Sequence, residues 1–296
     1  MCINVDALDP IIFSQLLISG LLAGALYALL ACGLNLVFGV MRIINLAHAE
    51  FMLIGAFGAY VLYVALGLHP LVSLVPMIVL VFVFGWVLQR WLVERVVGRP
   101  LLTSLLLTYA VSIVLINSGL AIFGADFKGV PKLQGALIIG ELAISKPRTV
   151  AGIVALLVTL AVWFFLERSR LGKAIRATSE HAQVAAICGI DVVRIRMLTM
   201  GLAGAMAAAA GVMLSVIYSF APETGADFIQ RCFAIIVLGG MGNFIGALIG
   251  GLLLGIVESY VGFFISTQWA EATAYLLLVT VLLLRPTGLR GVAHAP

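Results

Sequence analysis

Long apolar runs separated by short polar segments make up most of this chain. A helix that crosses a hydrocarbon core of about 30 Å needs about 20 apolar residues, so runs of that length predict membrane spans. The second run is interrupted by Gly67, His69 and Pro70 and should form two helices. The uncharged runs cover residues 11–39, 51–86, 101–125, 150–166, 197–222, 232–257 and 272–284. The pattern predicts roughly eight or nine transmembrane helices, with broken or re-entrant segments among them.

The composition agrees with a lipid solvent and excludes a soluble globular protein. Of the 296 residues, 63% are hydrophobic and 10% are charged, whereas soluble proteins average about 45–50% apolar and about 25% charged residues. Too few polar side chains are present to cover a soluble globule. The runs are continuously apolar and do not alternate as barrel strands do. We therefore predict an all-α polytopic membrane protein in which residues 1–296 form a single transmembrane domain.

Basic residues predict which side of the membrane each loop faces, because short loops rich in Lys and Arg stay cytoplasmic. Segments 89–100 and 167–196 together carry nine Lys and Arg residues and should share the cytoplasmic side, since two spans separate them. Segment 126–149 carries four and should be external. This assignment places the N-terminus outside and the C-terminal Arg285 and Arg290 inside, which requires an odd number of crossings. The net charge of +4 therefore reflects topology and gives no reason to expect a nucleic-acid partner.

A polar segment interrupts the apolar pattern and carries the first candidate site. It places Arg42, Asn45, His48 and Glu50 between two apolar runs. Ionisable groups at membrane depth cost about 2.5–3.5 kcal/mol each on insertion scales, so they usually face a cavity or a partner. On a helix Asn45 and His48 would share a face, and Arg42 and Glu50 should pair if both are deep. The alternative is a helix junction at the cytoplasmic membrane surface, where water would solvate all four side chains.

A glycine run inside the apolar stretch 232–257 is the second candidate. Its members are Gly239, Gly240, Gly242 and Asn243. Such a run breaks a helix, and broken backbone at membrane depth is tolerated where it lines a cavity or is buried in protein. A dinucleotide-binding loop would need a preceding strand, which the pattern lacks. We therefore take these four residues, with the four polar ones above, as candidates for a translocation path.

Other glycines are spaced so that helices can pack closely. In lipid the hydrophobic effect does not join helices, and small residues four positions apart allow their backbones to approach. We expect helix packing at these pairs, which are Gly20 with Gly24, Gly246 with Gly250, and Gly251 with Gly255.

The third candidate is the basic loop 167–196. Apolar residues at Ala174, Ala177, Val184, Ala185 and Ile187 predict a short amphipathic helix that lies against the membrane or a protein partner. Ser179 is a candidate N-cap for its second half.

No catalytic or metal-binding set is present in the sequence. The Gly-x-Ser-x-Gly elbow, the His-Glu-x-x-His pair and the phosphate-binding Gly-x-x-x-x-Gly-Lys loop are all missing. One His and one Glu near residue 50 are too few to ligate a metal. We therefore expect neither an enzyme nor a cofactor, and any ATP-driven activity must use an ATPase on another chain.

Six stretches, taken in order, resemble the membrane permeases of branched-chain amino-acid ABC importers of the LivH type. The resemblance runs over nearly all of the chain. The stretches are residues 24–29 (GALYAL) with 39–48 (GVMRIINLAH), 94–100 (ERVVGRP), 169–177 (SRLGKAIRA), 189–194 (GIDVVR), 237–247 (VLGGMGNFIGA) and 285–289 (RPTGL).

This resemblance implies an α-helical permease in the bacterial cytoplasmic (inner) membrane. Its implied partners are a second homologous permease of the LivM type, two ATP-binding subunits, an external substrate-binding protein and a small-molecule substrate. It also implies that loop 167–196 is a cytoplasmic coupling loop, with ATPase-coupling residues at Leu171, Gly172, Arg176, Ala185 and Gly189. The loop departs from the commonest Glu-Ala-Ala-x-x-x-Gly form, because Gln183 stands at the glutamate position, so no glutamate role is transferred.

The expected function is a permease subunit of an ATP-driven importer for branched-chain or related small amino acids. A similar permease for urea, short amides or other small acids is the first alternative. An ATP-independent channel or secondary carrier is a further one, and a carrier would need membrane-embedded carboxylates such as Glu50 or Glu258. An intramembrane enzyme is the third alternative.

Overall fold

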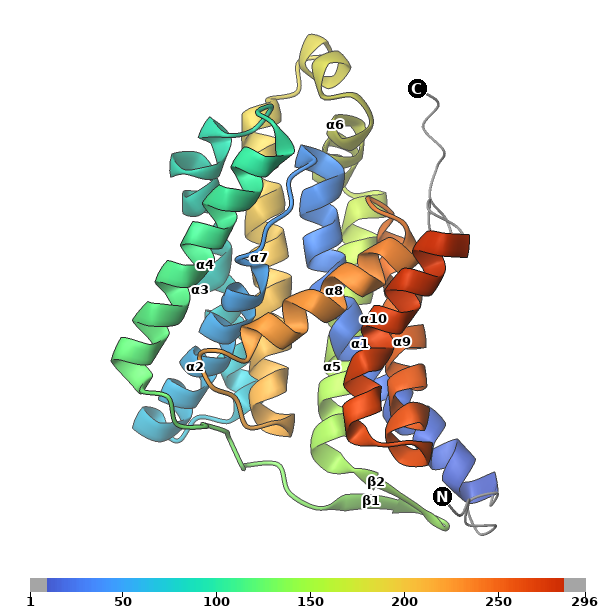
Figure 1. Cartoon of the computed structure of the whole chain (residues 1–296). Helices are drawn as coiled ribbons and strands as arrows, with labels where there is room; N and C mark the ends of the chain where they lie inside the picture. The colour runs from blue at the N-terminus through green and yellow to red at the C-terminus, as the bar shows by residue number, and fades with distance from the viewer. Residues whose placement is uncertain (1–9, 285–296) are drawn as a thin grey trace.

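The computed structural model describes residues 10–284 and is a bundle of α-helices with one β-hairpin (Figure 1). Its helices are α1 (Pro10–Met41), α2 (His48–Leu66), α3 (Pro70–Trp91), the 3-10 turn η2 (Val93–Arg95), α4 (Leu101–Phe123), α5 (Lys146–Arg168), α6 (Arg170–Ile187), α7 (Val192–Ile217), α8 (Gly225–Gly239), α9 (Phe244–Phe264) and α10 (Thr267–Leu284). The hairpin pairs β1 (Ala136–Ile139) with β2 (Leu142–Ser145) in antiparallel register.

Seven helical segments within residues 10–284 are long and apolar enough to cross a membrane. They comprise α1, α2, α3 with η2, α4, α5, α7 and α9. Helix α8 has 15 residues and extends about 22 Å, which is shorter than a hydrocarbon core of about 30 Å. The predicted polytopic all-α membrane fold, with a broken segment, is confirmed, although the described residues hold seven candidate spans where the sequence predicted roughly eight or nine. The small hairpin is an addition that the apolar pattern did not predict.

The two ends of the bundle carry different loops (Figure 1). Helix α6 lies at one end, together with the connection between α3 and α4 and the last turn of α10. The hairpin lies at the other end, near the start of α1. The two basic segments 89–100 and 167–196 are therefore on one side of the bundle, as their charges predicted. Arg285 and Arg290 lie outside the described residues.

The breaks between helices form where the sequence predicted them. Helix α2 ends at Gly67, which has a φ of 63°, and α3 begins at Pro70 after an N-cap at His69. The His69 ring accepts a hydrogen bond from the Leu71 amide at 3.3 Å. This confirms that residues 51–86 form two helices. The apolar run 150–166 belongs to a helix that already starts at Lys146, because Pro147 fits the first helical turn.

Helices α1 and α7 form the centre of the bundle. In their most apolar stretches 72% and 89% of residues are buried, against 11% in α4. Helices α1 and α9 cross through the glycines predicted to pack helices, because a Cβ at Gly24 would lie 2.8 Å from the Gly251 oxygen. From the α9 side of the same crossing, a Cβ at Gly251 would lie 2.6 Å from Ala28 Cα. These distances leave no room for side chains, so glycine packing at this crossing is confirmed.

Candidate functional site

Helix α2 begins inside the bundle, because the chain turns back after α1. Arg42 has a φ of 55°, and its amide donates to the Phe38 carbonyl at 2.8 Å, which closes the end of α1. Residues 43–47 then run back along the bundle to His48 (Figure 1). Arg42 itself is exposed, whereas Asn45, His48 and Glu50 are buried. Three of the four candidate residues of the polar segment therefore lie in the interior of the bundle.

Asn45 stabilises the irregular backbone that leads into α2. Its Oδ1 accepts a hydrogen bond from the Ala47 amide at 3.1 Å, and its Nδ2 lies 3.6 Å from Met200 Sδ. Thr108 of α4 supports the same turn, because its hydroxyl donates to the Ile44 carbonyl at 3.0 Å. Since Asn45 precedes α2, the two residues are not on one helix and the helical face that they would share there does not form. Asn45 acts as a turn residue whose side chain replaces missing backbone partners.

His48 is wedged against α1 and has no exposed surface. Its Nε2 lies 3.0 Å from the Leu30 carbonyl oxygen. A Cβ at Gly33 would lie 3.1 Å from the ring, so the glycine provides the space that the imidazole occupies. Its Nδ1 is buried without a hydrogen-bond partner among residues 10–284. His48 therefore ties α2 to α1 through one ring nitrogen and leaves the other unused.

Glu50 places a buried carboxylate beside the amino ends of two helices. It lies in the first turn of α2, and a Cβ at Gly225, the first residue of α8, would be 3.3 Å from Glu50 Oε1. The Ser112 hydroxyl of α4 donates to the same oxygen at 2.7 Å. The other oxygen, Oε2, is buried with no partner in the part of the chain that the structure describes. Helix amino ends carry partial positive charge, which favours an anionic group here.

The pairing of Arg42 with Glu50, expected if both were deep, does not form because Arg42 is exposed. The carboxylate takes its hydrogen bond from Ser112 instead, and the guanidinium is at the surface. The alternative of a fully solvated junction is also wrong, because Glu50 is 4% exposed and both Asn45 and His48 are 0% exposed. Only Arg42 behaves as a surface residue.

The glycine run forms a tight turn between α8 and α9. Gly239 ends α8, and Gly240 and Gly242 have φ values of 99° and 85°, which side chains other than glycine rarely adopt. Asn243 then caps α9, because its Oδ1 accepts a hydrogen bond from the Gly246 amide at 3.0 Å. The predicted helix break is confirmed, and its backbone needs partners from elsewhere in the bundle.

Asn35 of α1 supplies those partners. Its Nδ2 donates to the Asn243 carbonyl at 2.7 Å and lies 3.4 Å from the Gly240 carbonyl. Its Oδ1 accepts from the Gly242 amide at 2.7 Å, and the residue is 1% exposed. Sequence reasoning missed Asn35 because it searched apolar runs for charges only. An amide inside a long uncharged run was the available signal, since burying it without partners is costly.

Helix α1 separates the two candidate segments. Cys32, Asn35 and Gly39, spaced by three and four residues, face the glycine turn. Leu30 and Gly33 lie on another face and contact His48. The structure therefore places both predicted segments against the same stretch of α1 but does not join them into one site.

Helix α6 projects from the end of the bundle as two helical pieces. The backbone is non-helical at His181, which has φ −146° and ψ 93°. In the first piece the Gly172 amide donates to Ser169 Oγ at 2.8 Å, and Arg176 forms an ion pair with Glu167. These contacts anchor the first piece to the end of α5. Leu171 in the same piece is 47% exposed.

The second piece of α6 presents an apolar surface to the outside. Val184 is 56% exposed and Ile187 is 86% exposed, whereas Ala185 is buried against the bundle. The piece ends at Gly189, which has a φ of 83°. The amphipathic character that the sequence predicted is therefore present. Ser179 does not cap this piece, because its hydroxyl donates back to the Arg176 carbonyl at 2.7 Å.

Comparisons with known proteins identify relatives along most of the chain. The family model described as "Branched-chain amino acid transport system / permease component" matches residues 16–284. The branched-chain amino acid transport permease LivH of Escherichia coli K12 is 33% identical over 294 residues, which cover 94% of this chain and 96% of LivH. BraD of Pseudomonas aeruginosa is 34% identical over 295 residues, again 94% and 96%. The ribose import permease RbsC of Escherichia coli K12 is 30% identical over 135 residues, 43% of this chain and 42% of RbsC.

Proposed function

The chain belongs to the family of branched-chain amino acid transport permeases, and from that premise we propose that it imports branched-chain or related small amino acids. It does so as one of two permeases of an ATP-driven transporter in the bacterial cytoplasmic membrane. The match over 94% of the chain at 33% identity carries this proposal. The other permease is of the LivM type, and two ATP-binding subunits and an external substrate-binding protein complete the assembly.

The orientation follows from the charges and the positions of the loops. The end of the bundle that carries α6 faces the cytoplasm, because the nine Lys and Arg residues of segments 89–100 and 167–196 gather there. The hairpin and the connection between α7 and α8 then face the external binding protein. Loop 167–196 is the coupling loop of this single permease domain.

The second piece of α6 is the docking surface for an ATP-binding subunit. Val184 and Ile187 expose apolar side chains beyond the bundle, at a place where a soluble partner can cover them. Arg176 and Gly172 hold the first piece on α5, so a pull on α6 is transmitted to the membrane helices. ATP-driven closure of the ATP-binding subunits then rocks the permease between outward-open and inward-open states.

The amino-terminal ends of α2 and α8 lie inside the bundle. They form the part of the translocation path that this permease provides. The amino ends of these helices and the buried Glu50 offer both signs of charge within the bundle. Asn45 and His48 keep α2 in this position. The glycine turn, with Gly239, Gly240, Gly242 and Asn243, forms the opposite end of α8 and moves with it.

Uptake by the assembled transporter tests the proposal. Proteoliposomes that contain both permeases and the ATP-binding subunits, with ATP on the side of α6 and the binding protein on the other side, should accumulate radiolabelled leucine. Omitting ATP should abolish accumulation. Accumulation by the permeases alone would instead identify a channel or a secondary carrier. Uptake of radiolabelled urea, acetamide or a short carboxylic acid, without uptake of leucine, would replace the proposed substrate class.

Docking through α6 can be tested separately. Ile187→Glu places a charge in the exposed apolar surface and should reduce the amount of ATP-binding subunit that copurifies at least fivefold. Ile138→Glu is the matched control, because Ile138 is 77% exposed at the opposite end of the bundle. Equal copurification with both variants would contradict the assignment of α6 as the docking surface.

A further inference from the structure

A buried ion pair between α8 and α9 separates two cavities at the hairpin end of the bundle. Arg231 Nε lies 3.1 Å from Glu258 Oε1, and the two side chains are only 16% and 10% exposed. The guanidinium also lies 5.8 Å from the centre of the Tyr27 ring and 5.6 Å from that of Phe228. Its Nη1 donates to the Asp227 carbonyl at 3.4 Å. Glu258 belongs to a helix long and apolar enough to span a membrane, and ionisable residues in such spans are rare and mark substrate or ion pathways.

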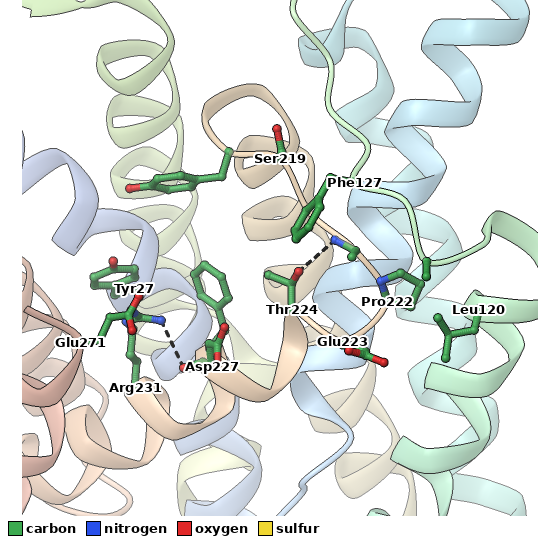
Figure 2. Close-up of a pocket in the computed structure, with 14 residues that line it drawn as sticks. Tyr27, Leu120, Phe127, Ser219, Pro222, Glu223, Thr224, Asp227, Arg231 and Glu271 are labelled. Atoms are coloured by element: carbon green, nitrogen blue, oxygen red, sulfur yellow. Dashed lines mark hydrogen bonds between the residues drawn. The ribbon is translucent and has the colours of Figure 1, made fainter. Parts of the chain in front are cut away.

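The first cavity has a volume of about 660 Å³ and opens between α4, α8 and the connection from α7 to α8 (Figure 2). Arg231 and Tyr27 lie on one side of it, and Leu120 and Pro222 lie on the other. A volume between about 300 and 1,000 Å³ is typical of small-molecule sites. The cavity can therefore accept a ligand of amino-acid size.

The second cavity, of about 520 Å³, follows one face of α1 and reaches Glu258 on α9. Tyr27 and Tyr218 line both cavities. Arg231 lines the first cavity and Glu258 the second. The ion pair with Tyr27 thus forms the partition between them.

We propose that the Arg231–Glu258 pair, with Tyr27, binds a small zwitterionic substrate in the permease. The substrate lies across this partition. Its carboxylate pairs with Arg231, which lines the first cavity, its ammonium group pairs with Glu258, which lines the second, and its own side chain lies against Tyr27, which lines both. This inference rests on the proposed function and names residues of its substrate path.

The chemistry favours a zwitterion over a singly charged ligand. Removing one partner from a buried ion pair leaves an uncompensated charge, at a cost of about 3–5 kcal/mol. A ligand with one carboxylate and one ammonium group replaces both partners at once and leaves neither charge alone. The guanidinium can bind a carboxylate through two parallel hydrogen bonds.

The other charges in the first cavity agree with this ligand. The lining of this cavity includes one cation, Arg231, and three acidic residues, Glu223, Asp227 and Glu271. The acidic residues attract the ammonium group from the external side, and the single guanidinium then fixes the carboxylate. An anionic substrate without an ammonium group would be repelled by these three carboxylates.

Replacing the pair by apolar residues gives a decisive experiment, because such replacements of buried ion pairs are often neutral or stabilising for folding. The double variant Arg231→Met with Glu258→Leu should assemble with its partners in wild-type amounts. Its ATP-dependent uptake of radiolabelled leucine into proteoliposomes should fall at least tenfold per assembled complex. The matched control is Arg99→Met with Glu141→Gln, two exposed residues outside both cavities, and its uptake should stay within twofold of wild type.

Exchanging the charges separates substrate binding from a purely structural pair. In the swap variant Arg231→Glu with Glu258→Arg the ion pair can form again, but the substrate would bind with its two ends reversed. We expect the complex to assemble and uptake to stay at least tenfold below wild type. Uptake restored by the swap, or wild-type uptake by the apolar double variant, would overturn the inference while the proposed function stands. Absence of leucine uptake by the wild-type complex would contradict the proposed function itself.

Discussion

Asn35 shows how a single side chain supports a break in the backbone of two other helices. Its side-chain oxygen accepts a hydrogen bond from the Gly242 backbone amide, and its side-chain nitrogen lies within hydrogen-bonding distance of the Asn243 and Gly240 carbonyls. All three backbone groups belong to the turn between α8 and α9. Backbone groups left unpaired in a lipid-surrounded bundle cost free energy, because no water replaces the missing partners. Asn35 therefore supplies the hydrogen-bond partners that water in a polar cavity would otherwise have to give to the glycine turn.

Replacing Asn35 should destabilise the fold by removing these bonds. In Asn35→Ala the buried groups of the turn lose their partner, at a cost of about 1–3 kcal/mol. Thermal unfolding of the purified protein in detergent should show a lowered midpoint. Asn117→Ala is the control, because Asn117 is exposed and its amide bonds only within α4 to Ile113. Equal midpoints for the two variants would show that the amide of Asn35 is dispensable.

Ser112 is the donor that the structure gives to the buried Glu50. Ser112→Ala should leave this carboxylate without a side-chain donor and weaken the contact between α2, α4 and the start of α8. We expect leucine uptake to fall at least threefold, together with a lower unfolding midpoint. Ser118→Ala on the same helix is the control, because Ser118 is exposed and donates to the Val114 carbonyl. Unchanged uptake by Ser112→Ala would remove Glu50 from the proposed path.

At the scale of elements, glycine sets the distance between α1 and α9. A Cβ at Gly251 would lie 2.6 Å from Ala28 Cα, in the helix backbone that cannot move aside easily. At Gly262, also on α9, a Cβ would lie 3.4 Å from the Ala270 side chain, which is an ordinary contact. A glycine-to-alanine substitution is therefore expected to clash at Gly251 but to be tolerated at Gly262, about three turns further along α9.

Gly251→Ala should overpack the crossing and destabilise the protein by about 1–3 kcal/mol. Gly262→Ala should be neutral or slightly stabilising, because alanine favours helix by up to about 1 kcal/mol over glycine. The yield and unfolding midpoint of both variants in detergent check this prediction. A midpoint for Gly251→Ala at or above that of Gly262→Ala would contradict the packing account.

The elements themselves could largely be predicted from local signals. The uncharged run 101–125 corresponds to α4, and the Gly67 to Pro70 break needs only the backbone preferences of glycine and proline. The hairpin does not show in the apolar pattern, because its four-residue strands are far shorter than a membrane span; Gly140, which adopts a φ of 63° in the turn, is its one local signal in the sequence. Local composition thus accounts for most of the helices.

The candidate site could be predicted only in part, because its partners come from distant parts of the chain. Glu50 and Ser112 are 62 residues apart, and Asn35 and Asn243 are 208 apart. No spacing rule connects such positions. The polar residues of α2 were singled out by their cost in lipid, but their burial depends on α1, α4 and α8. Arg231 was missed because it precedes an apolar run and resembles a loop residue in the sequence.

At the scale of the whole molecule, the proposed orientation makes opposite ends of the bundle accessible from opposite sides of the membrane. Cys188 is exposed at the end of α6, whereas Cys32 and Cys232 are buried. Glu141 is exposed in the hairpin turn. These positions allow the orientation to be measured with thiol reagents.

In a Cys2→Ser background, an impermeant maleimide added to spheroplasts should leave Cys188 unmodified and should label it in inside-out vesicles. Glu141→Cys, in a background that also carries Cys188→Ser, should show the reverse pattern. Labelling of Cys188 from the external side would place α6 outside the cell and contradict both the coupling assignment and the direction of import.

The hairpin has a consequence for how deeply the protein sits in its membrane. Gln15, near the start of α1, donates to the Ala143 carbonyl of β2 at 2.9 Å, so the hairpin is attached beside the first turns of that helix. Helix α1 has 32 residues and is about 48 Å long, well beyond the thickness of the hydrocarbon layer. A two-stranded ribbon has open edges whose polar groups cannot enter hydrocarbon. The ribbon therefore acts as a stop at the headgroups, and lipids with longer acyl chains should become locally compressed around the protein instead of covering the start of α1.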